Sequence, residues 1–150
     1  MVVYIVGYMY SGKSTYGRTL AERLGYDFVD LDHMIEERYH SSIGLIFQHY
    51  GEAAFRKMEQ EELHKTGEME NVVVATGGGT PCYGDNMDYI LEHGTSIYIK
   101  QTTEKILERQ RRSRKQRPLL AQMSDAELEA YVRRQMEERE VYYRRADYVV

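Results

Sequence analysis

The most constraining feature of this sequence is a glycine-rich stretch at residues 7–15, which reads Gly-Tyr-Met-Tyr-Ser-Gly-Lys-Ser-Thr. It fits the pattern G-x-x-x-x-G-K-[ST], whose backbone N–H groups surround a polyphosphate. Residues 2–6, which are β-branched and aromatic, predict a buried strand before it, and residues 16–24 predict a helix after it. The alternative is an ordinary glycine turn, which the full pattern between a strand and a helix disfavours. The stretch therefore indicates a P-loop that binds a nucleotide.

The residue types in this loop predict separate roles. Lys13 would bridge the β- and γ-phosphates of ATP, and the Ser14 hydroxyl would be a ligand of Mg²⁺. Glycine lets the backbone turn tightly, and the start of the helix adds its positive dipole end. Beside Lys13 and Ser14, we expect the nucleotide-binding residues of the loop to include Gly7, Ser11, Gly12 and Thr15.

Composition and charge exclude several classes of protein. The 150 residues suffice for one domain with a real core, and the net charge of −4 gives no basic field for nucleic acid. The single cysteine, Cys82, cannot form an internal disulfide, which suits a reducing compartment. A strand predicted two residues from the start leaves no room for a signal peptide, and no apolar stretch is long enough to span a membrane. We therefore expect a cytoplasmic protein, most simply a monomer, with no nucleic-acid or membrane partner.

Strands and helices alternate along the chain. Beyond residues 2–6, strands are predicted at 26–30, 71–75, 96–99 and 147–150, and helices beyond 16–24 at 31–39, 43–50, 52–68, 86–93, 102–109 and 124–144. This order predicts an α/β fold with a five-stranded parallel sheet and helices on both faces. Ligands bind at the carboxyl ends of such strands, which here carry Gly7, Asp30 and Gly77, so we expect those three to converge. Residues 76–81 should be irregular.

The pair Asp30 and Asp32 follows the second predicted strand. One carboxylate could hold Mg²⁺ through water, while the other could orient or deprotonate an attacking hydroxyl group. The alternative is that Asp30 simply caps the helix that follows. The position at a strand end favours a functional role for the pair.

Two arginines lie on otherwise packed helical faces. Arg56 is three residues before Glu59, so a structural ion pair is as plausible a role as ligand binding. Arg139 falls in an apolar stripe on the last helix, which is formed by Leu128, Val132, Met136 and Tyr143. A buried arginine needs an anion, so either an internal carboxylate or a substrate acid should meet Arg139.

Two further segments have unusual composition. Gly77, Gly78 and Gly79 follow the clearest core strand, and they allow the backbone to approach a ligand closely, although a flexible loop is the simpler alternative. The basic segment at about 110–123 contains Arg117 and could be a solvated charge run, a nucleic-acid patch or a mobile lid. The acidic net charge disfavours nucleic acid, and a lid that carries arginines to phosphates fits a P-loop. Cys82 and the five histidines show no metal-ligand spacing.

Taken together, these motifs resemble the shikimate kinase family over nearly the whole chain. The P-loop is shared by very many NTPases, but the set in this order is specific. It consists of the P-loop, Asp30-Leu31-Asp32, Gly51-Glu52-Ala53-Ala54-Phe55-Arg56 with Glu59, Thr76-Gly77-Gly78-Gly79, Arg117-Pro118-Leu119-Leu120, and Glu138-Arg139 followed by Tyr142 and Ala146-Asp147.

The resemblance implies a nucleoside-monophosphate-kinase-like fold that transfers the ATP γ-phosphate to the 3-hydroxyl of shikimate, in aromatic amino-acid synthesis. It implies one P-loop kinase domain over residues 1–150, with a substrate-binding helical segment at about 31–68 and the lid at about 110–123. Asp32 matches the proposed base, and Asp30 the residue near Mg²⁺. The resemblance also implies that Arg56 and Arg139 bind the shikimate carboxylate. Gly77, Gly78 and Gly79 would contact the ring of shikimate, and Arg117 would contact the phosphates.

The chain departs from the family pattern in three places. Tyr10 replaces a small P-loop residue, so its side chain should point away from the phosphates. The second lid arginine usually lies seven residues before the one matched by Arg117, where this chain has Gln110, so Arg109, Arg111 and Arg112 all remain candidates. The family pattern continues past the fifth strand, whereas this sequence ends at Val150.

Two other functions stay open on the sequence. A related kinase could phosphorylate another small hydroxy acid such as gluconate. A nucleotide-binding regulator without an acceptor substrate is the second alternative, although such a protein has no use for a clamp around a carboxylate.

Overall fold

The structure of the protein is a computed structural model that describes residues 1–113 and 123–150. Five parallel strands form one sheet in the order β2-β3-β1-β4-β5. Their bounds are β1 Val2–Val6, β2 Asp27–Asp30, β3 Val72–Ala75, β4 Thr95–Tyr98 and β5 Tyr148–Val149. The predicted five-stranded parallel sheet is therefore confirmed, with strand ends that differ by at most one residue.

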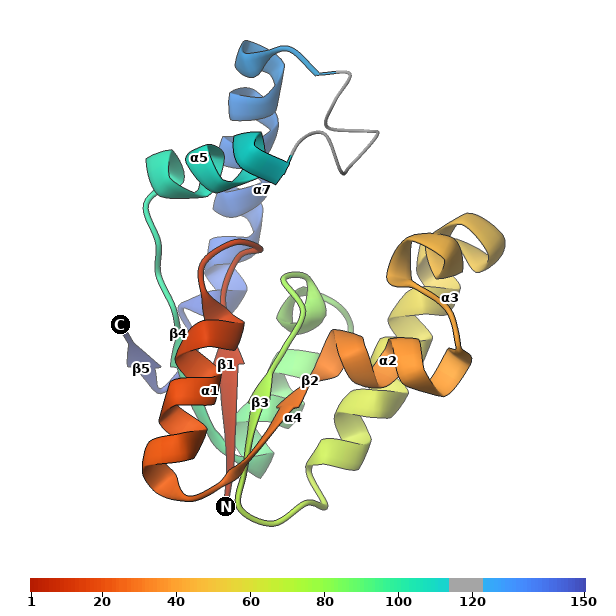
Figure 1. The fold of residues 1–150 in the computed structure, drawn as a ribbon, viewed down its shortest axis with the longest axis vertical. Helices are drawn as coiled ribbons and strands as arrows, with labels where there is room; N and C mark the ends of the chain where they lie inside the picture. The colour runs from red at the N-terminus through yellow and green to blue at the C-terminus, as the bar shows by residue number, and fades with distance from the viewer. Residues whose placement is uncertain (114–122) are drawn as a thin grey trace.

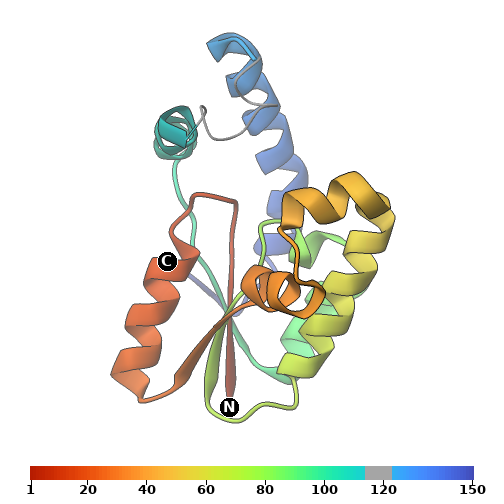
Figure 2. The same cartoon turned by 45° about the vertical axis from the view of Figure 1, so that its right-hand side comes forward.

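The helices are α1 Lys13–Leu24, α2 Leu31–Tyr39, α3 Ile43–Thr66, α4 Asn86–His93, α5 Thr103–Ser113 and α7 Asp125–Tyr143, with a short 3₁₀ helix, η1, at Thr80–Cys82. Figure 2 shows α1 on one face of the sheet and α2, α3 and α4 on the other, while α5 and α7 extend beyond its carboxyl edge (Figures 1 and 2). Helices on both faces are thus confirmed. None of the described helices is long and apolar enough to cross a membrane.

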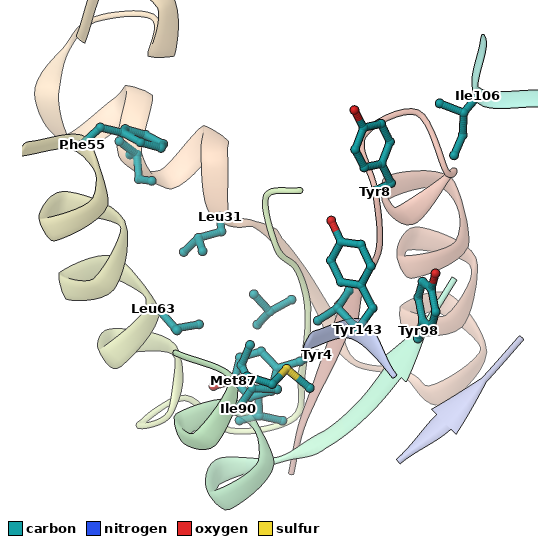
Figure 3. Packing of buried hydrophobic residues seen from close by; sticks show 14 of the residues in the cluster. Tyr4, Tyr8, Leu31, Phe55, Leu63, Met87, Ile90, Tyr98, Ile106 and Tyr143 are labelled. Carbon is teal, nitrogen blue, oxygen red and sulfur yellow. The ribbon is translucent and has the colours of Figure 1, made fainter. Parts of the chain in front are cut away.

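The core follows from the alternation of side chains along the central strand. Tyr4 and Val6 of β1 point into the larger apolar cluster, which Leu63 of α3 and Ile90 of α4 join (Figure 3). The alternate residues of β1, Val3 and Ile5, face α1. There they join Ala21 and Val73 in a second, smaller cluster. Since side chains alternate across a strand, a strand that is apolar on both faces must lie in the middle of a covered sheet.

Gly51 divides α3 into two helical segments. Its backbone has φ 83° and ψ 171°, a conformation outside the helical region that glycine adopts without steric cost. The two helices predicted at 43–50 and 52–68 are therefore present, joined at this kink. The second segment carries Arg56 and Glu59 toward the sheet.

Two local predictions need correction. The helix predicted to end at about residue 109 continues to Ser113, because Ile106, Leu107 and Gln110 form a buried face that extends the helix. The basic residues in this turn belong to its solvent face, so the first four residues assigned to the lid, 110–113, are helical. Residues 114–122, including Arg117, lie outside the described residues. The segment at 76–81 is not wholly irregular, since the helix η1 begins at Thr80 with proline in its first turn.

The strand ends converge as predicted. In the parallel register, Ala75 of β3 pairs with Ile5 of β1 on one side and with Asp30 of β2 on the other. The residues that follow each strand therefore start at the same edge of the sheet, where the P-loop, α2 and the glycine loop begin.

Candidate active site

A cavity of about 280 Å³ lies at this edge, between the P-loop and the loop after β3. The two loops lie side by side in Figure 1, and a Cβ on Gly78 would be 3.1 Å from the Met9 nitrogen atom. The cavity is lined by Met9, Tyr10, Gly12, Lys13, Ser14, Thr15, Asp30, Asp32, Thr76, Gly77 and Gly78. Most residues predicted for the nucleotide, metal and base roles thus surround one space.

The P-loop has the backbone that its glycines allow. Gly12 has φ 98°, and a Cβ on Gly7 would lie 2.8 Å from the Ile99 carbonyl oxygen, so a side chain at Gly7 would be excluded. Ser11 is buried within the loop. The Tyr10 hydroxyl pairs at 2.7 Å with Ser113 of α5, so this bulky side chain points toward α5.

Lys13 and Asp32 have opposite pKa shifts. Burial lowers the pKa of Lys13 to about 8, against the attraction of Asp32 and Asp30. Burial raises the pKa of Asp32 to about 6, and the negative charges of Asp30 and Glu59 add to the shift. The ammonium group of Lys13 donates to the carbonyl oxygens of Gly7 and Tyr8, both at 2.9 Å. A carboxylate with this pKa is ionised at neutral pH and accepts a proton more readily than an ordinary aspartate.

Asp30 caps α2, the alternative role considered for it, and also contacts Ser14 of the P-loop. One carboxylate oxygen accepts a hydrogen bond from the His33 backbone N–H and so caps α2. The other accepts a hydrogen bond of 3.2 Å from the Ser14 hydroxyl. A hydroxyl and a carboxylate in contact beside a phosphate-binding loop are hard oxygen ligands, so these residues fit Mg²⁺ that retains several waters.

The glycine loop, residues 77–79, lies against three of the predicted site residues. A Cβ on Gly77 would lie 2.9 Å from an Asp32 carboxylate oxygen, and one on Gly78 would lie 3.3 Å from an Arg139 nitrogen atom. A Cβ on Gly79 would lie 2.8 Å from both terminal nitrogen atoms of Arg56. Each glycine is therefore in contact with a different predicted site residue, and each contact depends on the absence of a side chain.

Arg56 makes the ion pair that was considered as its structural alternative. Its Nη1 atom donates to Glu59 at 3.0 Å, and the Glu59 side chain is only 1% exposed. The second oxygen of Glu59 accepts a hydrogen bond from the Thr80 hydroxyl, which in turn accepts one from the Gly77 N–H. The pair therefore orients the guanidinium and also ties α3 to the glycine loop, so it does not preclude ligand binding by Arg56.

Arg139 has no carboxylate partner among residues 1–113 and 123–150. Its guanidinium lies 5.6 Å from the centroid of the Tyr8 ring, and its buried Nη1 atom has no hydrogen-bond partner in the described part of the chain. The Tyr143 hydroxyl, one turn later on α7, donates to the Gly78 carbonyl oxygen. Of the two anions that could meet Arg139, the structure therefore favours a ligand over an internal carboxylate.

The three arginines considered for the second lid position differ in their contacts. Arg109 donates from Nη1 to the Tyr10 carbonyl oxygen at 2.6 Å and approaches Gly12 of the P-loop. Arg111 lies 3.8 Å from Asp125, and Arg112 pairs with Glu108 on the exposed face of α5. Of these three, Arg109 is the arginine that contacts the P-loop.

Three side chains organise the site, and the sequence indicated such a role for only one of them, Glu59. Glu59 and Thr80 connect Arg56 to Gly77, and the hydroxyl of Tyr143 holds the Gly78 carbonyl. A carboxylate three residues from Arg56 was a usable signal for Glu59. For Thr80 and Tyr143 no local pattern exists, because their partners are far away in the sequence.

Comparison with known proteins agrees with this geometry. The family model described as shikimate kinase matches residues 9–150. A shikimate kinase of Bacteroides fragilis is 42% identical over 147 residues, which span 98% of this chain and 82% of the relative. The crystal structure of shikimate kinase from Bacteroides thetaiotaomicron matches with a TM-score of 0.94 at 38% identity, and covers 99% of this chain and 85% of that one. Shikimate kinase from Acinetobacter baumannii in complex with shikimate matches with a TM-score of 0.89 at 37% identity, over 99% and 82% of the two chains. The chain therefore belongs to the shikimate kinase family.

Proposed function

We propose that this protein transfers the γ-phosphate of ATP to the 3-hydroxyl of shikimate and releases shikimate 3-phosphate and ADP. The observation that carries the proposal is the glycine loop, where three successive glycines contact Asp32, Arg139 and Arg56 beside the P-loop. One carboxylate and two arginines suit an acceptor that has both a hydroxyl and an acid group. A regulator without an acceptor has no use for this arrangement.

The P-loop holds the nucleotide in this proposal. Its backbone N–H groups and the amino end of α1 bind the phosphates, and Lys13 leaves the loop carbonyls to meet the β- and γ-phosphate oxygens. Arg109 supports the loop from α5 through the Tyr10 carbonyl. Arg117 remains the proposed arginine of the lid, on the basis of the family motif alone.

Mg²⁺ would be held by the Ser14 hydroxyl directly and by Asp30 through water, since these two oxygen groups already lie 3.2 Å apart. When bound, the ion neutralises charge on the β- and γ-phosphate oxygens. Asp30 keeps its capping hydrogen bond to α2, so one side chain would both cap that helix and help to hold the metal ion.

Asp32 acts as the general base. Its ionised carboxylate takes the proton of the 3-hydroxyl as that oxygen forms its bond to the γ-phosphorus, while the bond to the ADP oxygen breaks. The pKa of about 6 leaves this carboxyl ionised at neutral pH, and the contact with Gly77 restricts its position. Arg56 and Arg139 bind the carboxylate of shikimate from two sides of the glycine loop, which orients the ring.

The test is ADP release by the purified protein with shikimate, compared with gluconate and other hydroxy acids at equal concentration. We expect turnover that depends on shikimate and is lost in Lys13→Ala, whose loop backbone is unchanged. Equal or faster turnover with gluconate would move the assignment to a related acid kinase. ATP binding without turnover on any acid would favour a nucleotide-binding regulator.

We further propose that the enzyme works as a cytoplasmic monomer, without nucleic acid or membrane as a partner. The support is its ATP substrate, its single cysteine and its net charge of −4. Light scattering at micromolar concentration should give the mass of one chain. The mass of two chains would overturn the monomer.

A further inference from the structure

Besides its ion pair with Glu59, Arg56 lies close to two aromatic rings. The centre of its guanidinium lies 3.9 Å from the centroid of the Tyr83 ring and 5.2 Å from that of Phe55. The Arg56 side chain is 16% exposed, and its Nε atom, which lies 3.6 Å from Glu52, has no hydrogen-bond partner in the described part of the chain. The distance to Tyr83 is that of a guanidinium in direct contact with an aromatic ring.

Tyr83 is itself held in place. It follows η1 in an extended conformation, and its hydroxyl donates to Glu52 at 2.9 Å. Glu52 lies one helical turn before Arg56 on α3, so the same carboxylate faces the tyrosine hydroxyl and the guanidinium. The ring is therefore anchored to the helix that carries Arg56.

Tyr83 lies outside the space where the reaction is proposed to occur. It lines a separate cavity of about 230 Å³, together with Arg56, Lys57, Gln60, Gly84 and Asn86, and it is absent from the lining of the cavity beside the P-loop. Arg56 thus has one side at the glycine loop and the other against Tyr83. Tyr83 therefore contacts Arg56, the proposed carboxylate ligand, on the side away from the glycine loop.

We infer that Tyr83 is a positioning residue that presets the Arg56 guanidinium for an acidic substrate, an inference that rests on the proposed function of Arg56 as a carboxylate ligand. Arginine has a long side chain whose rotamer entropy is costly to remove on binding. A ring in contact with one face of the guanidinium removes part of that freedom before the ligand arrives. Because the ring covers a face, the N–H groups at the edge, of which Nη1 already donates to Glu59, keep their directions for acid groups. Preorganisation of this kind improves affinity without a new contact to the ligand.

Substitutions of Tyr83 can test the effect of its ring separately from the effect of its hydroxyl. If the ring face positions Arg56, Tyr83→Phe keeps the effect and Tyr83→Leu loses it. Expected kinetics for Tyr83→Leu are a rise of about 3- to 10-fold in the KM for shikimate, with kcat and the KM for ATP near wild-type values. Tyr50→Leu is the matched control, because Tyr50 is a tyrosine of α3 that is 65% exposed.

A second substrate tests whether Tyr83 affects the binding of the negative charge on the shikimate carboxylate. With the carboxamide of shikimate, which has no negative charge for Arg56, the KM ratio of Tyr83→Leu to wild type should fall to about one. If Tyr83→Leu unfolds at the assay temperature, Tyr83→Met replaces it as an unbranched side chain without a ring face.

Three results would overturn the inference. They are an unchanged KM for shikimate in Tyr83→Leu, a loss in Tyr83→Phe as large as in Tyr83→Leu, and an equal KM ratio for shikimate and its carboxamide together with a lower melting temperature. The last two would assign the effect to the Glu52 hydrogen bond and to a structural role of the ring. Failure of the proposed function is distinguishable, since the wild-type protein would then show no turnover of shikimate.

Discussion

A Cβ atom on Gly77 would lie 2.9 Å from a carboxylate oxygen of Asp32, closer than such contacts normally occur. The absence of a side chain at Gly77, two residues after the end of β3, therefore limits where the proposed base can lie. The backbone N–H of the same Gly77 donates a hydrogen bond to the Thr80 hydroxyl, which donates in turn to Glu59, the ion-pair partner of Arg56. The proposed base and one of the two arginines proposed to bind the substrate carboxylate thus both depend on the position of Gly77.

Gly77→Ala should lower kcat by about 10- to 100-fold, because the new methyl group displaces Asp32 from the attacking hydroxyl. Backbone strain contributes little, since Gly77 is not among the glycines with positive φ. Gly44→Ala is the control, as nothing lies within 4 Å of a Cβ at that position. Steady-state kinetics with shikimate compares the two variants, and equal kcat values would contradict the role given to this contact.

Asp32→Asn should lower kcat by roughly 10²- to 10⁴-fold, because the amide keeps the shape of the side chain but cannot accept the proton. In the wild-type enzyme, kcat/KM should fall as the pH drops below about 6, where the Asp32 carboxyl becomes protonated. That acid limb should be absent from the residual activity of Asp32→Asn. A small fall in kcat with a large rise in the KM for shikimate would instead mean that Asp32 only positions the substrate.

The raised pKa of Asp32 also predicts a pH-dependent change in stability. Its folded value of about 6 exceeds the ordinary 3.8, so the stabilising contribution is present below about pH 4 and is lost as the pH rises through 6. Asp32→Asn should therefore raise the free energy of unfolding by about 1–3 kcal/mol at pH 8 and by much less at pH 4.5. Urea unfolding at both pH values measures this, with Asp27→Asn at the exposed start of β2 as control. An equal gain at both pH values would contradict the assignment.

Arg139→Ala should weaken shikimate binding by roughly 10- to 100-fold through loss of a charge-assisted contact, while ATP affinity without shikimate stays unchanged. The melting temperature should hold or rise, because Arg139 has a buried nitrogen atom without a partner in the described residues. Arg139→Lys should restore binding only in part, since an ammonium lacks the planar fork. A marked fall in melting temperature with an unchanged KM for shikimate would show that Arg139 is structural.

Arg109→Ala should raise the KM for ATP by about 10-fold, because its hydrogen bond to the Tyr10 carbonyl supports the P-loop. The KM for shikimate should change little. Arg112→Ala is the matched control on the same helix, since Arg112 pairs with Glu108 at the surface. If both variants bind ATP equally well, Arg109 has no part in nucleotide binding.

The elements of the fold could be predicted from the sequence because their causes are local. The P-loop pattern, the apolar strands and the Ser124–Glu127 capping box each depend on residues a few positions apart, and the structure confirms the strands and the capping box. The convergence of Gly7, Asp30 and Gly77 also followed, since parallel strands place their carboxyl ends at one edge.

The roles of individual side chains were decided by tertiary structure. From the sequence, an ion pair with Glu59 and ligand binding were equally good explanations of Arg56. The structure shows that Glu59 pairs with Arg56 and also anchors the glycine loop, so the ion pair does not preclude ligand binding. Arg109 could not be separated from Arg111 and Arg112 until α5 was placed against the P-loop. Tyr83 had no signal at all, since its ring meets Arg56 only when η1 packs on α3. Local sequence determines which elements form, but burial, pKa shifts and contacts between distant residues arise only when those elements pack, because each depends on neighbours that the chain brings together from far apart.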